Sequence, residues 1–356
     1  MLYENIKDIV NLLKVLYSKP LFMMDQLLLM INNSNTVYSN PVPVIIDCDP
    51  GIDDAVAIML AASNPDFDIK AITTVSGNLQ AQQCAENAIR ILDMIGASEI
   101  PVVPGPSKPL VRPYPRDPFS HGTDGLAELG LPSPSRSCNS GYAPDVIVDL
   151  VRKYPNQIRI FALGPLTNLA LAIMKEPDLP NLVLDVICIG GSFGFDAVGT
   201  ARATGDNPAS EWNIYVDPEA AQIVFDSGIK LTAIGLDVAT HPDLELSVEH
   251  RRKLKNSGSK QAKFLLGVTS FVEKGGFGSY CGLIDSLAIA TAINKEVINT
   301  TVVKVAVETQ SVLSLGQTVV DHRENFAWSN INKLTVARTF DPDLFFDILL
   351  NGLTKA

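Results

Sequence analysis

The chain has little positive charge. Its 28 lysines and arginines are outnumbered by 39 aspartates and glutamates, which gives a formal net charge of −11 at pH 7. No run of basic residues interrupts this balance. Proteins that bind nucleic acids or anionic membranes gather Lys and Arg on one surface. The composition therefore argues against both kinds of partner.

Long apolar runs and paired cysteines are also missing. No segment of the 356 residues is long and apolar enough to span a bilayer. The five cysteines are scattered and show no C-x-x-C spacing. This pattern argues against a disulfide framework or a zinc site and favours a reducing compartment. We therefore expect a cytoplasmic protein.

The first 40 residues contain two apolar stretches, residues 9–17 and 21–31, which Pro20 and several charged residues interrupt. The interruptions spoil both a signal-peptide core and a spanning helix. The acidic residues in this part of the chain argue against a transit peptide. We expect a helical N-terminal extension over residues 1–40, followed by one domain over residues 41–356.

Four aspartates within eight residues are the most informative feature of the sequence: Asp47, Asp49, Asp53 and Asp54. A β-branched run precedes them and an apolar helical pattern follows, which predicts a strand, a tight turn and a helix. One or two aspartates could cap the helix. Four without a neighbouring Lys or Arg indicate instead a bound hard cation with oxygen ligands.

Strand and helix patterns alternate along the rest of the chain with short links. Further strands are predicted at residues 69–75, 101–105, 158–163, 184–189, 231–236 and 302–307. Helices are predicted around residues 85–95, 145–153, 244–272, 281–293 and 342–353; a further helix begins at residues 166–168, and residues 211–221 lead into another. Such alternation predicts a single-domain, three-layer αβα fold with a mostly parallel, Rossmann-like sheet.

Several polar or small residues fall at the ends of these strands. Parallel strands place their carboxyl ends at one edge of the sheet, where ligands bind. We expect the following residues to share that edge: Asp47, Asp49, Asn78, Leu163, Gly190, Gly191 and Asp237. The irregular stretch at residues 106–142 is long enough to be a functional loop. Asp285 lies inside the apolar helical pattern of residues 281–293, where an unpaired charge is costly, so it is a candidate metal ligand.

Residues 47–54 (DCDPGIDD) match, position for position, the DxDPGxDD signature of the inosine-uridine-preferring nucleoside hydrolase family. Four further motifs and Asp285 match in the same order: residues 72–78 (ITTVSGN), 121–126 (HGTDGL), 163–170 (LGPLTNLA) and 211–220 (EWNIYVDPEA). The chain resembles this family from about residue 42 to its C-terminus. The resemblance implies a nucleoside hydrolase fold and Ca²⁺-dependent hydrolysis of uridine- or inosine-type ribonucleosides to free base and ribose.

The resemblance also implies roles for individual residues. Asp49, Asp54, Asp285 and the backbone carbonyl of Leu163 would bind Ca²⁺. Asp49 would also be the base that activates the attacking water.

Asp53, Asn78 and Asn213 would bind the ribose 2′- and 3′-hydroxyls, and Glu211 the 5′-hydroxyl. Asp47 would support the metal site through hydrogen bonds. On residue type alone, the two asparagines could instead be turn formers.

The sequence departs from the family on the side of the leaving base. Ile284 occupies the place of the histidine that protonates the base in nonspecific members, and the tryptophan of purine-preferring members is absent there as well. His121 matches a base-pocket histidine of the family and is the candidate catalytic contact for the leaving group, with an ordinary surface histidine as the alternative. The family's asparagine for the 5′-hydroxyl has no clean equivalent, and Asn207 is the candidate.

Two other functions remain open from the sequence. A Mg²⁺-dependent phosphotransferase of the haloacid-dehalogenase type also begins with a strand and a DxD motif, although Pro50 is atypical of it. A Ca²⁺-dependent nucleoside-binding protein without catalysis would also fit. For an enzyme of the resembled family, the expected partners are a small ribonucleoside and further copies of the chain, in a homodimer or homotetramer.

Overall fold

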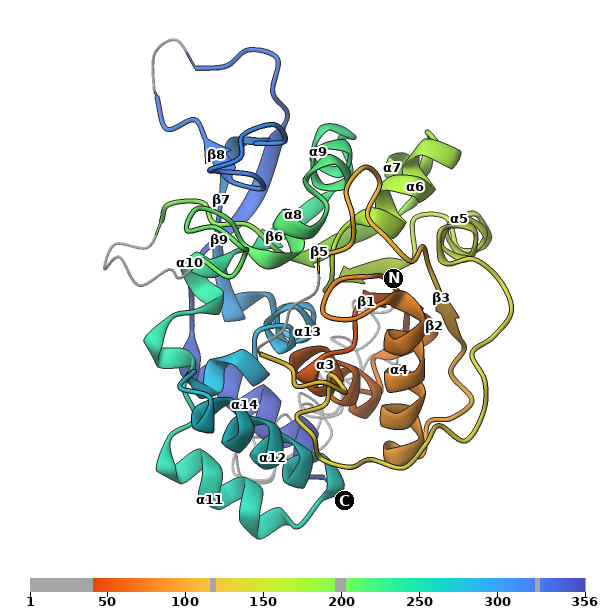
Figure 1. Cartoon of the computed structure of the whole chain (residues 1–356), viewed down its shortest axis with the longest axis vertical. Helices are drawn as coiled ribbons and strands as arrows, with labels where there is room; N and C mark the ends of the chain where they lie inside the picture. Colours follow the sequence, from red (N-terminus) through yellow and green to blue (C-terminus); the bar gives the residue numbers. More distant parts are fainter. Residues whose placement is uncertain (1–40, 116–119, 196–202, 324–326, 356) are drawn as a thin grey trace, which may run out of the picture. The chain divides into compact units, whose positions relative to one another are not determined.

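A computed structural model describes residues 41–115, 120–195, 203–323 and 327–355 (Figure 1). By internal contacts the chain separates into the unit Met1–Asn40 and the unit Pro41–Ala356. The helical extension predicted for residues 1–40 lies outside the described residues. The second unit is an α/β domain with a mostly parallel central sheet, as the sequence predicts.

Nine strands form the sheet in the order β3-β2-β1-β4-β5-β6-β9-β7-β8. Their bounds are β1 Val42–Cys48, β2 Phe67–Thr74, β3 Val102–Pro104, β4 Arg159–Ala162, β5 Asp185–Ile189, β6 Leu231–Ile234, β7 Ile298–Val307, β8 Thr318–Val320 and β9 Lys333–Phe340. Seven strands run parallel, and β7 and β8 form an antiparallel edge beyond β9.

Both faces of the sheet are buried. Along β1, Val44 and Ile46 belong to one apolar cluster and Ile45 to the other, because successive side chains of a strand point to opposite faces. On the first side lie α3 Ile52–Ser63, α4 Ala81–Ile95, α11 Val248–Ser257, α12 Lys260–Lys274, α13 Ser286–Ile293 and α14 Pro342–Leu353. On the second lie α5 Ala143–Lys153, α6 Thr167–Lys175 and α9 Pro218–Asp226.

Short helical segments complete the fold: α7 Leu179–Leu182, α8 Trp212–Val216, α10 Leu236–Ala239 and the 3₁₀ turns η1 Pro242–Leu244, η2 Ser279–Gly282 and η3 Lys295–Val297. No helix in the described ranges is both long and apolar enough to cross a membrane. Between β3 and α5 the described residues form neither helix nor strand, which confirms the irregular stretch expected at residues 106–142.

Two expectations about the C-terminal third were wrong. The sequence predicts one helix over residues 281–293, but the structure has the turn η2 and then α13, with Asp285 just before the helix. The backbone already departs from helical geometry at Leu283. The strands β8 and β9 were not predicted, because polar residues dilute their short alternating patterns.

The strand order reverses beside β1. From β1 the chain builds β2 and β3 on one side, and then returns to place β4, β5 and β6 on the other. The connections leaving the carboxyl ends of β1 and β4 therefore turn apart and leave a crevice between them. This crevice is where the fold alone predicts a ligand site.

Candidate active site

A cavity of about 460 Å³ opens at the carboxyl ends of the central strands. Its acidic floor contains Asp49, Asp53 and Asp285, and residues following β2, β4 and β5 complete it. The other lining residues used below are Asn78, His121, Leu163, Glu211, Trp212, Asn213, Phe277, Tyr280, Cys281 and Ile284. Of the seven residues predicted to share this edge of the sheet, Asp49, Asn78 and Leu163 line the cavity.

Three carboxylates gather at the floor. Asp53, Asp54 and Asp285 each offer an oxygen, and these oxygens all lie within 4.8 Å of one another. All three side chains are buried, and no Lys or Arg is found among the described residues that line the cavity. Burial raises the pKa of Asp54 and of Asp285, and for Asp285 the charges of Asp53 and Asp54 raise the pKa further. This donor set could hold a metal ion.

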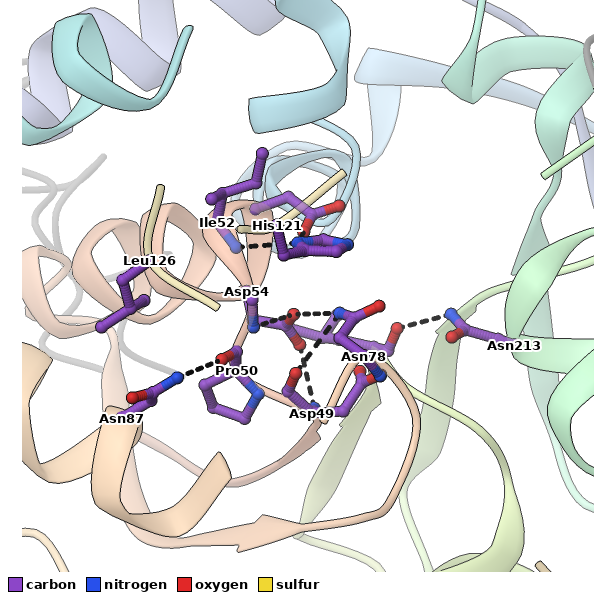
Figure 2. Close-up of polar contacts among 12 residues, drawn as sticks. Asp49, Pro50, Ile52, Asp54, Asn78, Asn87, His121, Leu126 and Asn213 are labelled. Carbon is purple, nitrogen blue, oxygen red and sulfur yellow. Dashed lines mark hydrogen bonds and ion pairs between the residues drawn. The ribbon is translucent and has the colours of Figure 1, made fainter. Parts of the chain in front are cut away.

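The turn after β1 fixes Asp54 within this group. Its Oδ1 accepts a hydrogen bond from the backbone N–H of Asp49 at 3.1 Å, and its Oδ2 accepts one from Gly51 at 3.0 Å. The side-chain amide of Asn78 also donates to Oδ2, at 3.3 Å (Figure 2). The Asp54 carboxylate thus stabilises the acidic turn at the start of α3 by accepting hydrogen bonds from its backbone.

Asp49 is held on three sides. Its Oδ2 accepts a hydrogen bond from the backbone N–H of Asn78 at 2.6 Å. A Cβ atom at Gly77 would lie 2.0 Å from Oδ2, and one at Gly164 would lie 2.5 Å from Oδ1. Burial, followed by the charge of Asp54, raises the pKa of this carboxyl well above its usual range. Asp49 lies beside the three-carboxylate group but is not one of its members.

Asp47 lies below the floor and does not line the cavity. Its Oδ1 accepts hydrogen bonds from Thr73 Oγ1 at 2.6 Å and from Asn168 Nδ2 at 2.7 Å. Burial raises its pKa to about 7, and these two bonds oppose the shift. Asp47 therefore connects the ends of β1 and β2 with the start of α6.

Asn213 and Glu211 form the wall beyond β4 and β5. Asn213 Nδ2 donates to the carbonyl oxygens of Leu163 at 2.7 Å and of Ile189 at 3.1 Å. Glu211 caps α8 and accepts from the backbone N–H groups of Asn213, Ile214 and Gly191. Burial nevertheless raises the pKa of Glu211 to about 7.

His121 reaches the cavity from the irregular stretch. Its Nδ1 accepts a hydrogen bond from the backbone N–H of Ile52 at 3.1 Å (Figure 2). Because Nδ1 is the acceptor, the proton of the neutral ring lies on Nε2. The same Nδ1 lies 3.9 Å from Asp53 Oδ1. The histidine and the acidic turn are therefore direct neighbours, although 69 positions separate His121 from Ile52 in the sequence.

Most of the remaining wall was not predicted as part of a site. It is largely apolar and aromatic, and includes Trp212, Phe277, Tyr280 and Ile284, together with Cys281. Burial raises the pKa of the Cys281 thiol to about 12, so the thiol keeps its proton. The only sign of this wall in the sequence is a glycine-rich break at residues 275–278. The break does not reveal that the side chains after it, Tyr280 and Cys281, line the cavity.

Asn207 and Asp237, both expected near the site, make hydrogen bonds outside the cavity. Asn207 does not line the cavity: its amide donates to the carbonyl of Leu315 at 2.9 Å and accepts from Ala209 N–H at 2.9 Å. Asp237 lies at the start of α10, and its carboxylate accepts from the backbone N–H groups of Phe193 and Phe195. Both residues shape loops near the cavity instead of contributing to its lining.

Comparison with known proteins agrees with this geometry. Residues 44–347 match the sequence profile of the inosine-uridine preferring nucleoside hydrolase family. The pyrimidine-specific ribonucleoside hydrolase RihA of Citrobacter koseri is 37% identical over 317 residues, which cover 87% of this chain and 97% of RihA. Uridine nucleosidase 1 of Arabidopsis thaliana is 36% identical over 324 residues, covering 88% of this chain and 93% of that protein.

Among solved structures, the plant nucleoside hydrolase PpNRh1 superimposes with a TM-score of 0.78 at 29% identity. The superposition covers 89% of this chain and all of PpNRh1. Residues 44–347, which match the family profile, include the described residues that line the cavity. The chain belongs to the inosine-uridine preferring nucleoside hydrolase family, and it is a nucleoside-hydrolysing enzyme.

Proposed function

We propose that the enzyme uses Ca²⁺ to hydrolyse the N-glycosidic bond of uridine- and inosine-type ribonucleosides, releasing the free base and ribose. The observation that carries the proposal is the buried acidic floor at the strand-order reversal, with an apolar and aromatic wall above it. Such a site suits a neutral sugar at the floor and a flat base at the wall. The names of the two curated relatives favour pyrimidine nucleosides.

Asp49, Asp54, Asp285 and the Leu163 carbonyl are the proposed Ca²⁺ ligands. Carboxylate and carbonyl oxygens are the ligands that Ca²⁺ prefers, and a cation would offset the burial and the mutual repulsion of the carboxylates, which raise the pKa of Asp49 and of Asp285. The Leu163 carbonyl accepts one hydrogen bond, from Asn213, and a carbonyl oxygen has a second lone pair. Asp53 is close enough to belong to the same group. The ion would supply positive charge that orients hydroxyls and lowers the pKa of a water.

Asp49 is the proposed general base. Its carboxylate has a fixed direction, because the Asn78 N–H holds Oδ2 and the two glycines leave no space for rotation. A base held in one orientation can take a proton from water without first being ordered. Water then adds to C1′ of the ribose while the bond to the base breaks.

Asp53, Asn78, Asn213 and Glu211 are the proposed ribose-binding residues. Asn213 uses its N–H₂ group on two carbonyls, and Asn78 uses its own on Asp49 and Asp54. Both asparagines therefore keep their amide oxygens for sugar hydroxyls, which can donate to them. With Asn207 used elsewhere, the proposed contact to the 5′-hydroxyl depends on Glu211 alone.

His121 is the proposed contact to the leaving base. Its Nε2–H is a donor, since the Ile52 N–H occupies Nδ1. Ile284 lines the same cavity and offers no proton. A donor near the base favours departure because the base leaves with added negative charge.

The direct test is release of reducing sugar from uridine, cytidine, inosine and adenosine, together with a metal analysis of the purified protein. Ribose release that depends on Ca²⁺ and favours uridine or inosine supports the proposal. Tight binding of nucleosides without release of base would identify a binding protein instead. Analytical ultracentrifugation would test whether the chain forms a homodimer or homotetramer. Microscopy of a tagged chain would test the cytoplasmic location that the cysteine pattern favours.

Asp49→Asn tests the assignment of the base. We expect kcat for nucleosides to fall by about 10²- to 10⁴-fold, the usual contribution of a positioned acid or base, while the circular dichroism spectrum stays unchanged. Asp66→Asn is a matched control, because Asp66 is exposed and remote from the cavity. Full activity in Asp49→Asn, or in metal-free enzyme, would contradict the mechanism.

A further inference from the structure

Asn87 connects two parts of the active site without lining the cavity. It belongs to α4, and only 1% of it is exposed. Its Nδ2 donates one hydrogen bond to the carbonyl of Pro50 at 3.1 Å and another to the carbonyl of Asp124 at 2.9 Å. Figure 2 shows the first of these bonds, which reaches the acidic turn from the side.

The orientation of this amide is unambiguous. Both neighbours are carbonyl oxygens, which only accept hydrogen bonds, so the N–H₂ group must face them. Among the described residues, the buried Oδ1 of Asn87 has no hydrogen-bond partner. A buried acceptor without a donor costs stability. The two hydrogen bonds that Asn87 donates therefore account for an asparagine at this position, because burying its amide oxygen is unfavourable.

The carbonyls of Pro50 and Asp124 belong to the two segments that the hydrogen bond between His121 and Ile52 joins. Pro50 lies in the acidic turn, one residue after Asp49. Asp124 lies three residues after His121, in a segment without helix or strand.

That segment has its own internal order. The N–H of Ala127 donates to the carbonyl of His121 at 3.0 Å, and Asp124 Oδ1 accepts from Leu126 N–H at 2.8 Å. Gly125 lies close against Asn87: its φ is +78°, and a Cβ there would lie 2.9 Å from Asn87 Nδ2. These hydrogen bonds connect both Asp124 and His121 with residues 126 and 127 of the same segment.

We propose that Asn87 is a positioning residue for the leaving-group side, which fixes the 121–128 segment against the acidic turn and so places His121 over Ile52 and Asp53. This inference depends on the proposed function, because it assigns His121 to the departing base. The expected effect of losing Asn87 is specific: departure of the base suffers, whereas sugar binding and water activation persist.

The test compares two leaving groups. Nucleosides need a donor for the base, whereas 4-nitrophenyl β-D-ribofuranoside releases a stable phenolate that needs none. Asn87→Leu keeps the approximate volume of the side chain and removes both donors. We expect its kcat/KM for the better of uridine and inosine to fall by about 10- to 100-fold. Its kcat/KM for the nitrophenyl riboside should stay within about twofold, the usual limit of additivity.

A double-mutant cycle with His121→Ala identifies the route of the effect. If Asn87 acts through His121, the double variant should be no worse on nucleosides than His121→Ala alone. Gln83→Leu is the matched control, because Gln83 is an exposed amide on the same helix. It should leave both reactions unchanged.

The inference would be overturned if Asn87→Leu lowered kcat/KM equally for both substrates. It would also be overturned if the loss in the double variant equalled the product of the losses in the two single variants. A parent enzyme that cleaves neither substrate would overturn the proposed function as well, so the two failures are distinguishable. If Asn87→Leu does not fold, Gly125→Ala takes its place, since the added methyl group would lie 2.3 Å from Leu79 Cδ1 and 2.9 Å from Asn87 Nδ2, the atom that donates both hydrogen bonds. The same selective loss is expected there, and its absence would count against the proposal.

Discussion

Among single residues, Asp49 shows how close packing can fix a reactive group. Gly77 and Gly164 approach its two carboxylate oxygens from opposite connections, after β2 and β4. Neither approach is possible for a residue with a Cβ atom, because the distances of 2.0 and 2.5 Å are far below van der Waals contact. The orientation of the proposed base therefore depends on the absence of a Cβ atom at both Gly77 and Gly164.

Gly77→Ala should therefore disable the enzyme without unfolding it. The methyl group has to displace the Asp49 carboxylate, and we expect kcat for nucleosides to fall by about 10²-fold or more, because misplacement by 1 Å can have that cost. Steady-state kinetics together with calcium titration would measure the effect. Normal kcat and calcium affinity would mean that Asp49 tolerates displacement.

Gly352→Ala is the control for crowding alone. A Cβ at Gly352 would lie 2.4 Å from Leu60 Cδ1, in the packing between α14 and α3 and remote from Asp49. We expect this variant to lower the melting temperature and to keep the kcat of its folded fraction. A comparable loss of kcat in both variants would show that crowding, and not the position of Asp49, is responsible.

Among the elements, the turn η2 shapes the apolar wall of the cavity. Glu245 fixes this turn: its Oε2 accepts from the backbone N–H of Ser279 at 2.7 Å and also from the Ser279 hydroxyl. The hydroxyl oxygen in turn accepts from Leu246 N–H at 2.8 Å. The two residues that follow, Tyr280 and Cys281, line the cavity. A carboxylate outside the cavity therefore determines the shape of its wall.

Glu245→Ala should loosen this wall. Loss of hydrogen bonds to a charged group costs about 1.5–3 kcal/mol, and we expect KM for nucleosides to rise by about tenfold or more while calcium affinity stays unchanged. Michaelis–Menten kinetics and calcium titration would separate the two effects. Glu249→Ala is a suitable control, since Glu249 is an exposed glutamate on the neighbouring helix α11. A change in calcium affinity in Glu245→Ala would show that the turn also shapes the acidic floor.

In the molecule as a whole, the buried acids connect metal binding with stability. Burial raises the pKa of Asp47 and of Glu211 to about 7, and it also raises those of Asp49, Asp54 and Asp285. In the unfolded chain these groups lose their protons near pH 4. Between about pH 4 and pH 7 the folded, metal-free protein therefore holds more protons than the unfolded chain.

The free energy of unfolding of the metal-free protein should thus fall as pH rises from about 4 to about 7, by about 1.4 kcal/mol per pH unit for each of Asp47 and Glu211. Above about pH 7, Asp47 and Glu211 are ionised in both the folded and the unfolded state and add nothing further to the slope. Calcium should raise the melting temperature more at pH 7 than at pH 5, because it binds the ionised floor. Urea unfolding of chelator-treated protein across this range would test the slope, and Glu211→Gln should make it shallower. A flat profile in the parent protein would contradict this account.

The class of fold and most of the acidic floor follow from local patterns in the sequence. Alternating strand and helix patterns predicted the parallel sheet, and the helix predicted at residues 342–353 matches α14. Asp49, Asp53 and Asp54 were recognisable because four acids in eight residues have no simpler explanation. Local signals of this kind survive folding because strand, turn and helix are encoded within a few residues.

Which further residues complete the site depends on how distant elements pack. The sequence already suggested Asp285 as a ligand, but it did not indicate that Asn87 reaches the acidic turn from α4 or that η2 brings Tyr280 to the wall. Asn207, which the sequence suggested, is used by its own loop. These outcomes depend on packing between elements far apart in the chain, and the local sequence pattern carries little information about such packing.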